Sequence, residues 1–179
     1  MSAWNTPGNG GDAPRTLDAL MALAYAMEAE AAERYGELAD MMEAHNNADV
    51  AALFRRLEKI EHIHARKILA DMHWKAPPAT ERHGFGGSLE APETTPSDEV
   101  HYLMQPYQAL ELALAAERRA VAFFEQLFAA ATVPEVRDAA REMAEDEREH
   151  VMLVEAWLKK VPKPEVDWAD DPDPPRYTE

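Results

Sequence analysis

The chain carries two Glu-x-x-His pairs, and each pair lies midway along a long amphipathic stretch. Residues three apart on an α-helix point the same way, so each pair presents one carboxylate and one imidazole to a single point in space. One isolated acid in an otherwise apolar stretch precedes each pair. The six residues are Glu28, Glu61, His64, Glu117, Glu147 and His150. Four helices can direct such a set toward a common axis, so the pattern predicts an all-α four-helix bundle.

The two halves of the chain repeat each other around these residues. The segment LEKIEHIHARKIL can be laid over MAEDEREHVMLVE with the glutamate and the histidine of both pairs in register. Placing Glu28 on Glu117 also aligns Tyr35 with Phe124. The repeat indicates two helical hairpins of common origin. Counted from the turn of each hairpin, the four glutamates lie within about one helical turn, ~5 Å, of the same depth, so we expect them to share one layer.

Carboxylates mixed with imidazoles suit a pair of divalent metal ions, because these donors hold iron or manganese in open coordination. The charges of four buried carboxylates would be balanced by two such ions, whereas leaving them unpaired costs several kcal/mol per ion, about the effective penalty for a buried charge. Any one glutamate taken alone is better explained as a solvated side chain. The matched spacing and depth of the set predict a site for two Fe ions, with Mn as the alternative.

Strong helix formers dominate four stretches, which we expect to be helical. They cover residues 16–43, 47–74, 97–131 and 132–160, with a fresh start of the third at Pro106. Thr132 and Glu135 have capping-box spacing and are expected to begin the fourth helix. A short polar break joins the first two helices into a hairpin, whereas residues 75–96 are rich in proline and glycine. This long connection predicts a crossover that places the second and third helices parallel.

The predicted bundle domain spans residues 16–160, between a flexible N-terminus at 1–15 and an acidic, proline-rich tail at 161–179. The formal net charge of −16 argues against nucleic-acid binding and against an anionic membrane surface. The N-terminal stretch lacks the pattern of a secretory signal, so we expect a cytoplasmic protein. The absence of cysteine excludes disulfides, zinc-thiolate sites and iron–sulfur clusters from this sequence.

At these residues the chain resembles the ferritin-like superfamily and, within it, the rubrerythrin-like di-iron carboxylate proteins. The resemblance covers about residues 16–160 and rests on the motifs EAEAAERY, EHIH, AAERRAVAFF and EDEREH. It implies a ferritin-like four-helix bundle in which all six residues bind metal. Glu61 and Glu147 would bridge the two ions, with Glu28 and Glu117 as terminal ligands.

Two departures from the family restrict what the resemblance implies. Rubrerythrins carry a rubredoxin domain with cysteine-bound iron, which a chain without cysteine lacks. They also carry an additional glutamate one turn after the ligand of the third helix, where this chain has Ala120. A built-in electron relay is therefore not expected. Tyr35 is a candidate hydrogen-bond donor near the metals, and a core aromatic with its hydroxyl satisfied elsewhere is the alternative.

The expected function is that of a di-iron oxidoreductase, which reacts with dioxygen or hydrogen peroxide. It would act as a ferrous iron oxidase or as a rubrerythrin-like peroxidase with a separate electron donor. The alternative is a non-catalytic bundle that buffers metal or serves as an interaction module. Long hairpins with much alanine and leucine also predict a homodimer.

Overall fold

The computed structural model describes residues 14–78 and 104–164, which form four helices and no strand. The helices are α1 (Leu17–Ala44), α2 (Ala48–Asp71), α3 (Pro106–Ala130) and α4 (Pro134–Leu158). The all-α four-helix architecture predicted from the sequence is confirmed. Among the described residues, no helix is both long enough and apolar enough to cross a bilayer.

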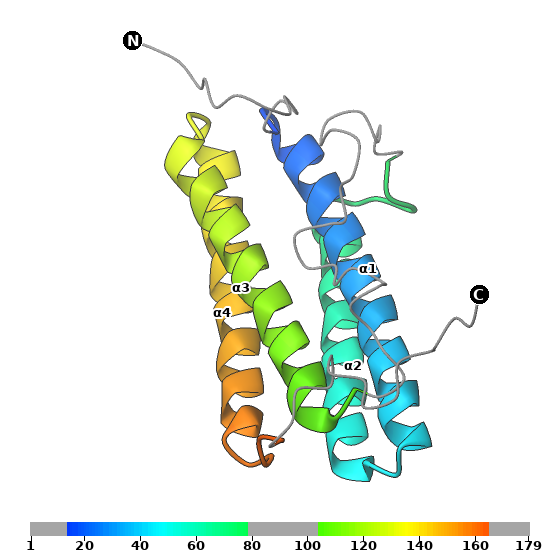
Figure 1. The fold of residues 1–179 in the computed structure, drawn as a ribbon. Coiled ribbons are helices and arrows are strands. Elements are labelled where there is room, and N and C mark those ends of the chain that lie inside the picture. The colour runs from blue at the N-terminus through cyan, green and yellow to red at the C-terminus, as the bar shows by residue number, and fades with distance from the viewer. Residues whose placement is uncertain (1–13, 79–103, 165–179) are drawn as a thin grey trace, which may run out of the picture.

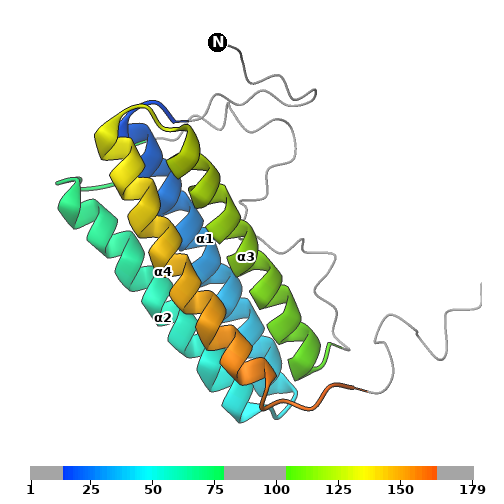
Figure 2. The same cartoon turned by 90° about the vertical axis from the view of Figure 1, so that its left-hand side faces the viewer.

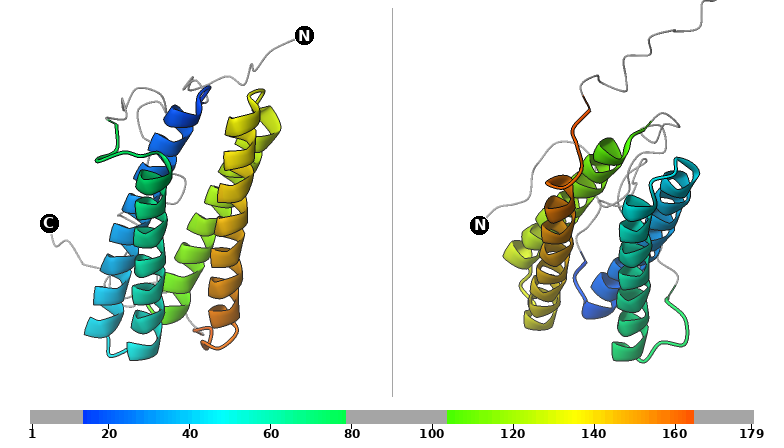
Figure 3. Two further views of the ribbon diagram at one scale, coloured as in Figure 1. Left: turned by 180° about the vertical axis from the view of Figure 1, so that it is seen from behind. Right: turned by 90° about the horizontal axis from the view of Figure 1, so that it is seen from below.

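Two antiparallel hairpins, α1 with α2 and α3 with α4, make up the bundle (Figure 1). Viewed from below, the two hairpins lie side by side as two helix pairs (Figure 3, right). The helices α2 and α3 run in the same direction, so the chain must travel the length of the bundle between them (Figures 1 and 2). The predicted crossover is therefore confirmed, although most of the connecting segment lies outside the described residues.

Local signals set the helix ends. The Thr16 side chain caps α1 by accepting a hydrogen bond from the amide of Ala19. Just after α1, Asn46 adopts the left-handed backbone region, with φ of 57°, which asparagine tolerates better than most residues. At α3, Gln105 and Gln108 form a capping box, and Pro106 occupies the first turn.

The predicted start of the fourth helix at Thr132 is wrong. The residue before the helix is Val133, whose side chain makes no capping hydrogen bond, and Pro134 is the first helical residue. Proline suits this position because its φ is already close to helical and it has no amide hydrogen to satisfy. The shift of one residue removes Thr132 and Glu135 from the two positions that a capping box requires.

The two segments predicted to flank the bundle domain lie largely outside the part of the chain that the structure describes, so the domain division stays a prediction. Residues 1–13 and 165–179 are not described, and neither is most of the expected prelude to α3. Val161, just after α4, still packs against the core. The side chain of Lys163 lies 5.8 Å from the ring centre of Tyr107 at the start of α3.

The apolar core consists of two clusters at opposite ends of the bundle. One includes Leu38 and Phe54, near the turn between α1 and α2. The other includes Leu20, Ile68 and Phe124, toward the opposite end. Along every helix, the change from one cluster to the other occurs at a buried glutamate. The bundle thus carries one polar layer between two apolar ones.

Candidate metal centre

One glutamate from each helix occupies the polar layer. Their exposed fractions are only 1 or 2%. The four are Glu28 of α1, Glu61 of α2, Glu117 of α3 and Glu147 of α4. Because glutamate is rarely buried without a charged or hydrogen-bonding partner, four of them in one layer require compensation.

His150 lies at the centre of three of these carboxylates. Its Nδ1 is 3.1 Å from an oxygen of Glu61, 3.4 Å from one of Glu117 and 3.3 Å from one of Glu147. The side chain is 4% exposed. The expectation that the helices direct these side chains toward a common axis is met here, since Glu61 comes from the first hairpin and His150 from the second.

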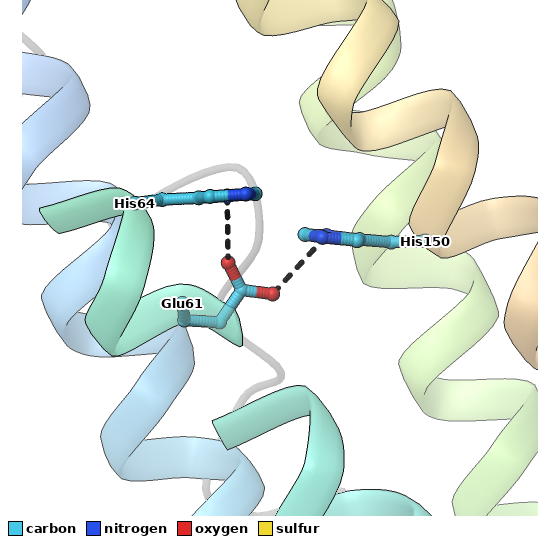
Figure 4. A group of neighbouring side chains, drawn as sticks. All are labelled: Glu61, His64 and His150. Carbon is cyan, nitrogen blue, oxygen red and sulfur yellow. Dashed lines mark ion pairs between the residues drawn. The ribbon is translucent and has the colours of Figure 1, made fainter. Parts of the chain in front are cut away.

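The carboxylate of Glu61 points toward both imidazoles, with one oxygen directed to each ring (Figure 4). One of its oxygens faces His150, and the other is 3.7 Å from Nδ1 of His64. An oxygen of Glu28 is also 3.7 Å from this Nδ1. Glu61 is therefore the carboxylate that is close to both histidines, a position suited to bridging two ions.

The hydroxyl of Tyr35 donates a hydrogen bond to the carboxylate of Glu117. Tyr35 is 3% exposed, and its ring stacks on Phe54 with centres 6.0 Å apart. Of the two interpretations left open by the sequence, the structure supports the donor near the cluster. A sequence signal was present, because Tyr35 lies seven residues after Glu28 and therefore on the same face of α1.

Burial raises the pKa of Glu61 well above its ordinary value of 4.5, and the charges of Glu28 and Glu147 act in the same direction, while His150 opposes them. Burial also raises the pKa of Glu147, aided by the charges of Glu117 and Glu28. For His150, burial lowers the pKa, but the surrounding carboxylates outweigh it and raise the value to about 12. In the metal-free protein these shifts favour protonated carboxyl groups at Glu61 and Glu147 and a protonated imidazole at His150, which reduces the buried negative charge.

Four polar atoms of the cluster have no hydrogen-bond partner within residues 14–78 and 104–164. They are Oε2 of Glu28, Oε2 of Glu61, Nδ1 of His64 and Nδ1 of His150. Buried polar atoms without partners are uncommon and each one calls for an explanation. Divalent cations coordinated by these oxygen and nitrogen atoms would satisfy them, so the donor set fits the metal ions that the sequence predicts.

Among the described residues, two overlapping groups of three have possible ligand atoms close enough together to hold an ion. One contains Glu61, His64 and His150, and the other contains Glu117, Glu147 and His150. Within each group, the ligand atoms lie within 4.8 Å of one another. Glu28 belongs to neither group, although it contacts His64. The buried Glu/His cluster is therefore a candidate metal site.

Comparisons with known proteins agree with this arrangement. The family model for rubrerythrin matches residues 19–87, and the model for the ferritin-like domain matches residues 106–176. A solved structure of an uncharacterized conserved protein from Magnetospirillum magnetotacticum MS-1 is 35% identical to this chain, with a TM-score of 0.68. The match covers 85% of this chain and 99% of that one. The chain belongs to the ferritin-like family and is rubrerythrin-like. A search of the curated proteins found no match.

In this rubrerythrin-like protein, the two family models divide the chain at the connection between the hairpins, in line with the predicted repeat. The hairpins differ where the repeat pairs Tyr35 with Phe124, since only the first of these aromatic side chains can donate to the cluster. Ala120, which stands where rubrerythrins have another glutamate, is fully buried in the apolar cluster around Phe124. The structure brings all six predicted residues together, and their role as ligands stays a prediction.

Proposed function

We propose that this protein binds two iron or manganese ions in the polar layer and reacts with dioxygen or hydrogen peroxide, drawing electrons from a separate donor. The observation that carries the proposal is the convergence of four buried carboxylates and two imidazoles with unpartnered atoms. Two adjacent metal ions can supply the electrons needed to cleave an O–O bond. Oxidation of ferrous iron and reduction of peroxide are both consistent with this donor set.

The side chains have separate tasks in this proposal. Glu61, which directs one oxygen toward each histidine, would hold the two ions at a fixed distance. Tyr35 orients the carboxylate of Glu117 through its hydrogen bond, which leaves that carboxylate fewer alternative positions. The apolar clusters on both sides of the layer limit water, and electrostatic interactions are stronger in such surroundings.

Protons are part of the same chemistry. Glu61 and Glu147 hold protons more strongly than ordinary glutamates in the metal-free protein, so binding of cations must displace them. The negative charge of the carboxylates is thereby balanced by protons in the metal-free protein and by cations in the metal-bound protein.

The first test is metal content. Protein prepared without chelator and analysed by inductively coupled plasma mass spectrometry should carry up to two iron or manganese ions per chain. Addition of ferrous or manganous ion to metal-free protein should raise the melting temperature, because a ligand at 100 times its dissociation constant adds about 2.7 kcal/mol. No bound metal and no shift with either ion would contradict the proposal.

The second test separates an enzyme from a metal buffer. With a chemical reductant present, an enzyme consumes many equivalents of peroxide or dioxygen per chain, whereas a buffer stops after the equivalents set by its bound metal. Consumption should be followed with an oxygen electrode and a peroxide assay. A reaction that ends after one equivalent would favour the non-catalytic alternative.

A further inference from the structure

A small hollow opens between α2 and α4 and reaches the cluster at His64. Its volume is about 40 Å³, which is enough for a water molecule. Its walls include Met21 of α1, Ile68 of α2 and Met143 of α4. A larger hollow of about 460 Å³ near the α1–α2 turn touches none of the six cluster residues.

His64 is the member of the cluster that solvent can reach. Its side chain is 19% exposed, whereas that of His150 is 4% exposed and the four glutamates are more buried still. Oε2 of Glu28 and Oε2 of Glu61 each lie 3.7 Å from Nδ1 of His64, and none of these three atoms has a hydrogen-bond partner among the described residues. His64 is therefore the cluster residue that lines the hollow, and it is in contact with two carboxylate oxygens that could also bind a cation.

The outer part of the hollow is acidic. Asp71, Glu142 and Asp146 line it, with Lys67 as its one basic side chain. On α4, Glu142 and Asp146 lie on successive turns on the side of His150. Within the described part of the chain, none of the four makes an ion pair, so these charges are not neutralised by neighbouring side chains.

We propose that divalent cations reach the cluster through this hollow and that Asp71, Glu142 and Asp146 accelerate their approach. Grouped negative charge in a concave surface concentrates cations and raises their association rate. Lys67 opposes this attraction. His64, Glu28 and Glu61 then receive the ion at the inner end. This inference rests on the proposed function, since it requires that the cluster binds metal.

The test measures the rate of cobalt(II) binding to metal-free protein by stopped-flow absorption, with cobalt(II) alone as the probe. D71N/E142Q/D146N should slow association by about tenfold at low ionic strength, in the range expected for electrostatic attraction into a cleft. Added salt should shrink the difference, because it screens exposed charges. The number of ions bound at saturation should not change.

A matched control removes the same amount of charge elsewhere. Glu33, Glu145 and Glu149 are exposed and make no ion pair with another described residue. E33Q/E145Q/E149Q should change the rate by less than about twofold, because these charges lie outside the hollow. Two further variants test the sign of the charge effect and the need for open space in the hollow. K67Q should speed cobalt(II) association, because it removes a positive charge. A139L should slow association at every salt concentration, because its larger side chain would occupy the hollow.

The possible outcomes distinguish the proposed access route from the proposed metal site. Equal rates for the two triple variants, together with an unchanged rate in A139L, would overturn the access route while leaving the metal site intact. Failure of the wild-type protein to bind cobalt(II), ferrous or manganous ion at equilibrium would overturn the proposed function and the access route together.

Discussion

The imidazole rings of His64 and His150 lie nearly parallel, at 10°, with their centres 5.3 Å apart. Each comes from a different hairpin, and the carboxylate of Glu61 directs one oxygen toward each of them (Figure 4). The two halves of the repeat thus meet at the histidines. A change to either residue should affect a site shared by both halves.

Replacing Glu61 or His64 by alanine should abolish metal loading at one or both positions, since each removes a donor for which no neighbouring side chain substitutes. Glu58→Ala and His62→Ala are the matched controls on the same helix, and both should load metal like the wild type. Metal per chain, measured after equilibrium dialysis, decides the comparison. Equal losses in both sets would show that the metal-binding face of α2 has been misassigned.

Tyr35→Phe should weaken metal binding by about 10- to 100-fold, the usual effect of removing a hydrogen-bond donor to a ligand. The ring and its stacking on Phe54 are retained, so the loss reports on the hydroxyl. Tyr25→Phe, also on α1 and packed in the other apolar cluster, is the control. Competition with a chelator measures the affinities. Unchanged affinity in Tyr35→Phe would mean that the hydrogen bond to Glu117 does not support the site.

The metal-free protein should lose stability as pH rises. The pKa values of Glu61 and Glu147 are raised in the fold above their ordinary 4.5, and that of His150 is raised from 6.5 to about 12. The folded state therefore binds more protons than the unfolded state above about pH 5, and its free energy of unfolding falls with increasing pH.

Urea unfolding of chelator-treated protein at pH 5, 7 and 9 would measure this trend. Glu61→Gln should show a shallower decline than the wild type, because one of the raised groups no longer titrates, while the charge of the remaining surface is the same. If the free energy of unfolding of the metal-free wild type instead increases from pH 5 to pH 9, the prediction is wrong.

The protein should be a homodimer. Ile63 and Met152 remain 53% and 62% exposed on α2 and α4, and the hairpins are rich in alanine and leucine. Burying such side chains against a second copy would stabilise the assembly. Sedimentation at micromolar concentration should give about twice the chain mass of 20.1 kDa. A mass near that of one chain would rule out the dimer.

Much of the fold could be predicted because its determinants are local. Helical spacing places Glu61 with His64 and Glu147 with His150 whatever the rest of the chain does. The repeat then pairs Glu28 with Glu117 and indicates two hairpins. The predicted start of α4 is wrong because Pro134 outweighs the capping pattern of Thr132 and Glu135. Both signals lie within four residues, so the sequence contains them both but does not show which one is stronger.

The contacts between helices and the exposure of the site depend on how the hairpins pack, and residue spacing within one helix does not predict them. The partner of Tyr35 is 82 residues away along the chain, so its hydrogen bond to Glu117 is set by the distance between α1 and α3. His64 and His150 occupy equivalent positions in the repeat, yet His64 is more exposed than His150. This difference arises from the packing of the helices and cannot be predicted from the repeat. Sequence periodicity alone determined which side chains face inward, because it acts within one helix. Tertiary structure decided which of them touch and which one solvent reaches, because those distances depend on every side chain between the helices.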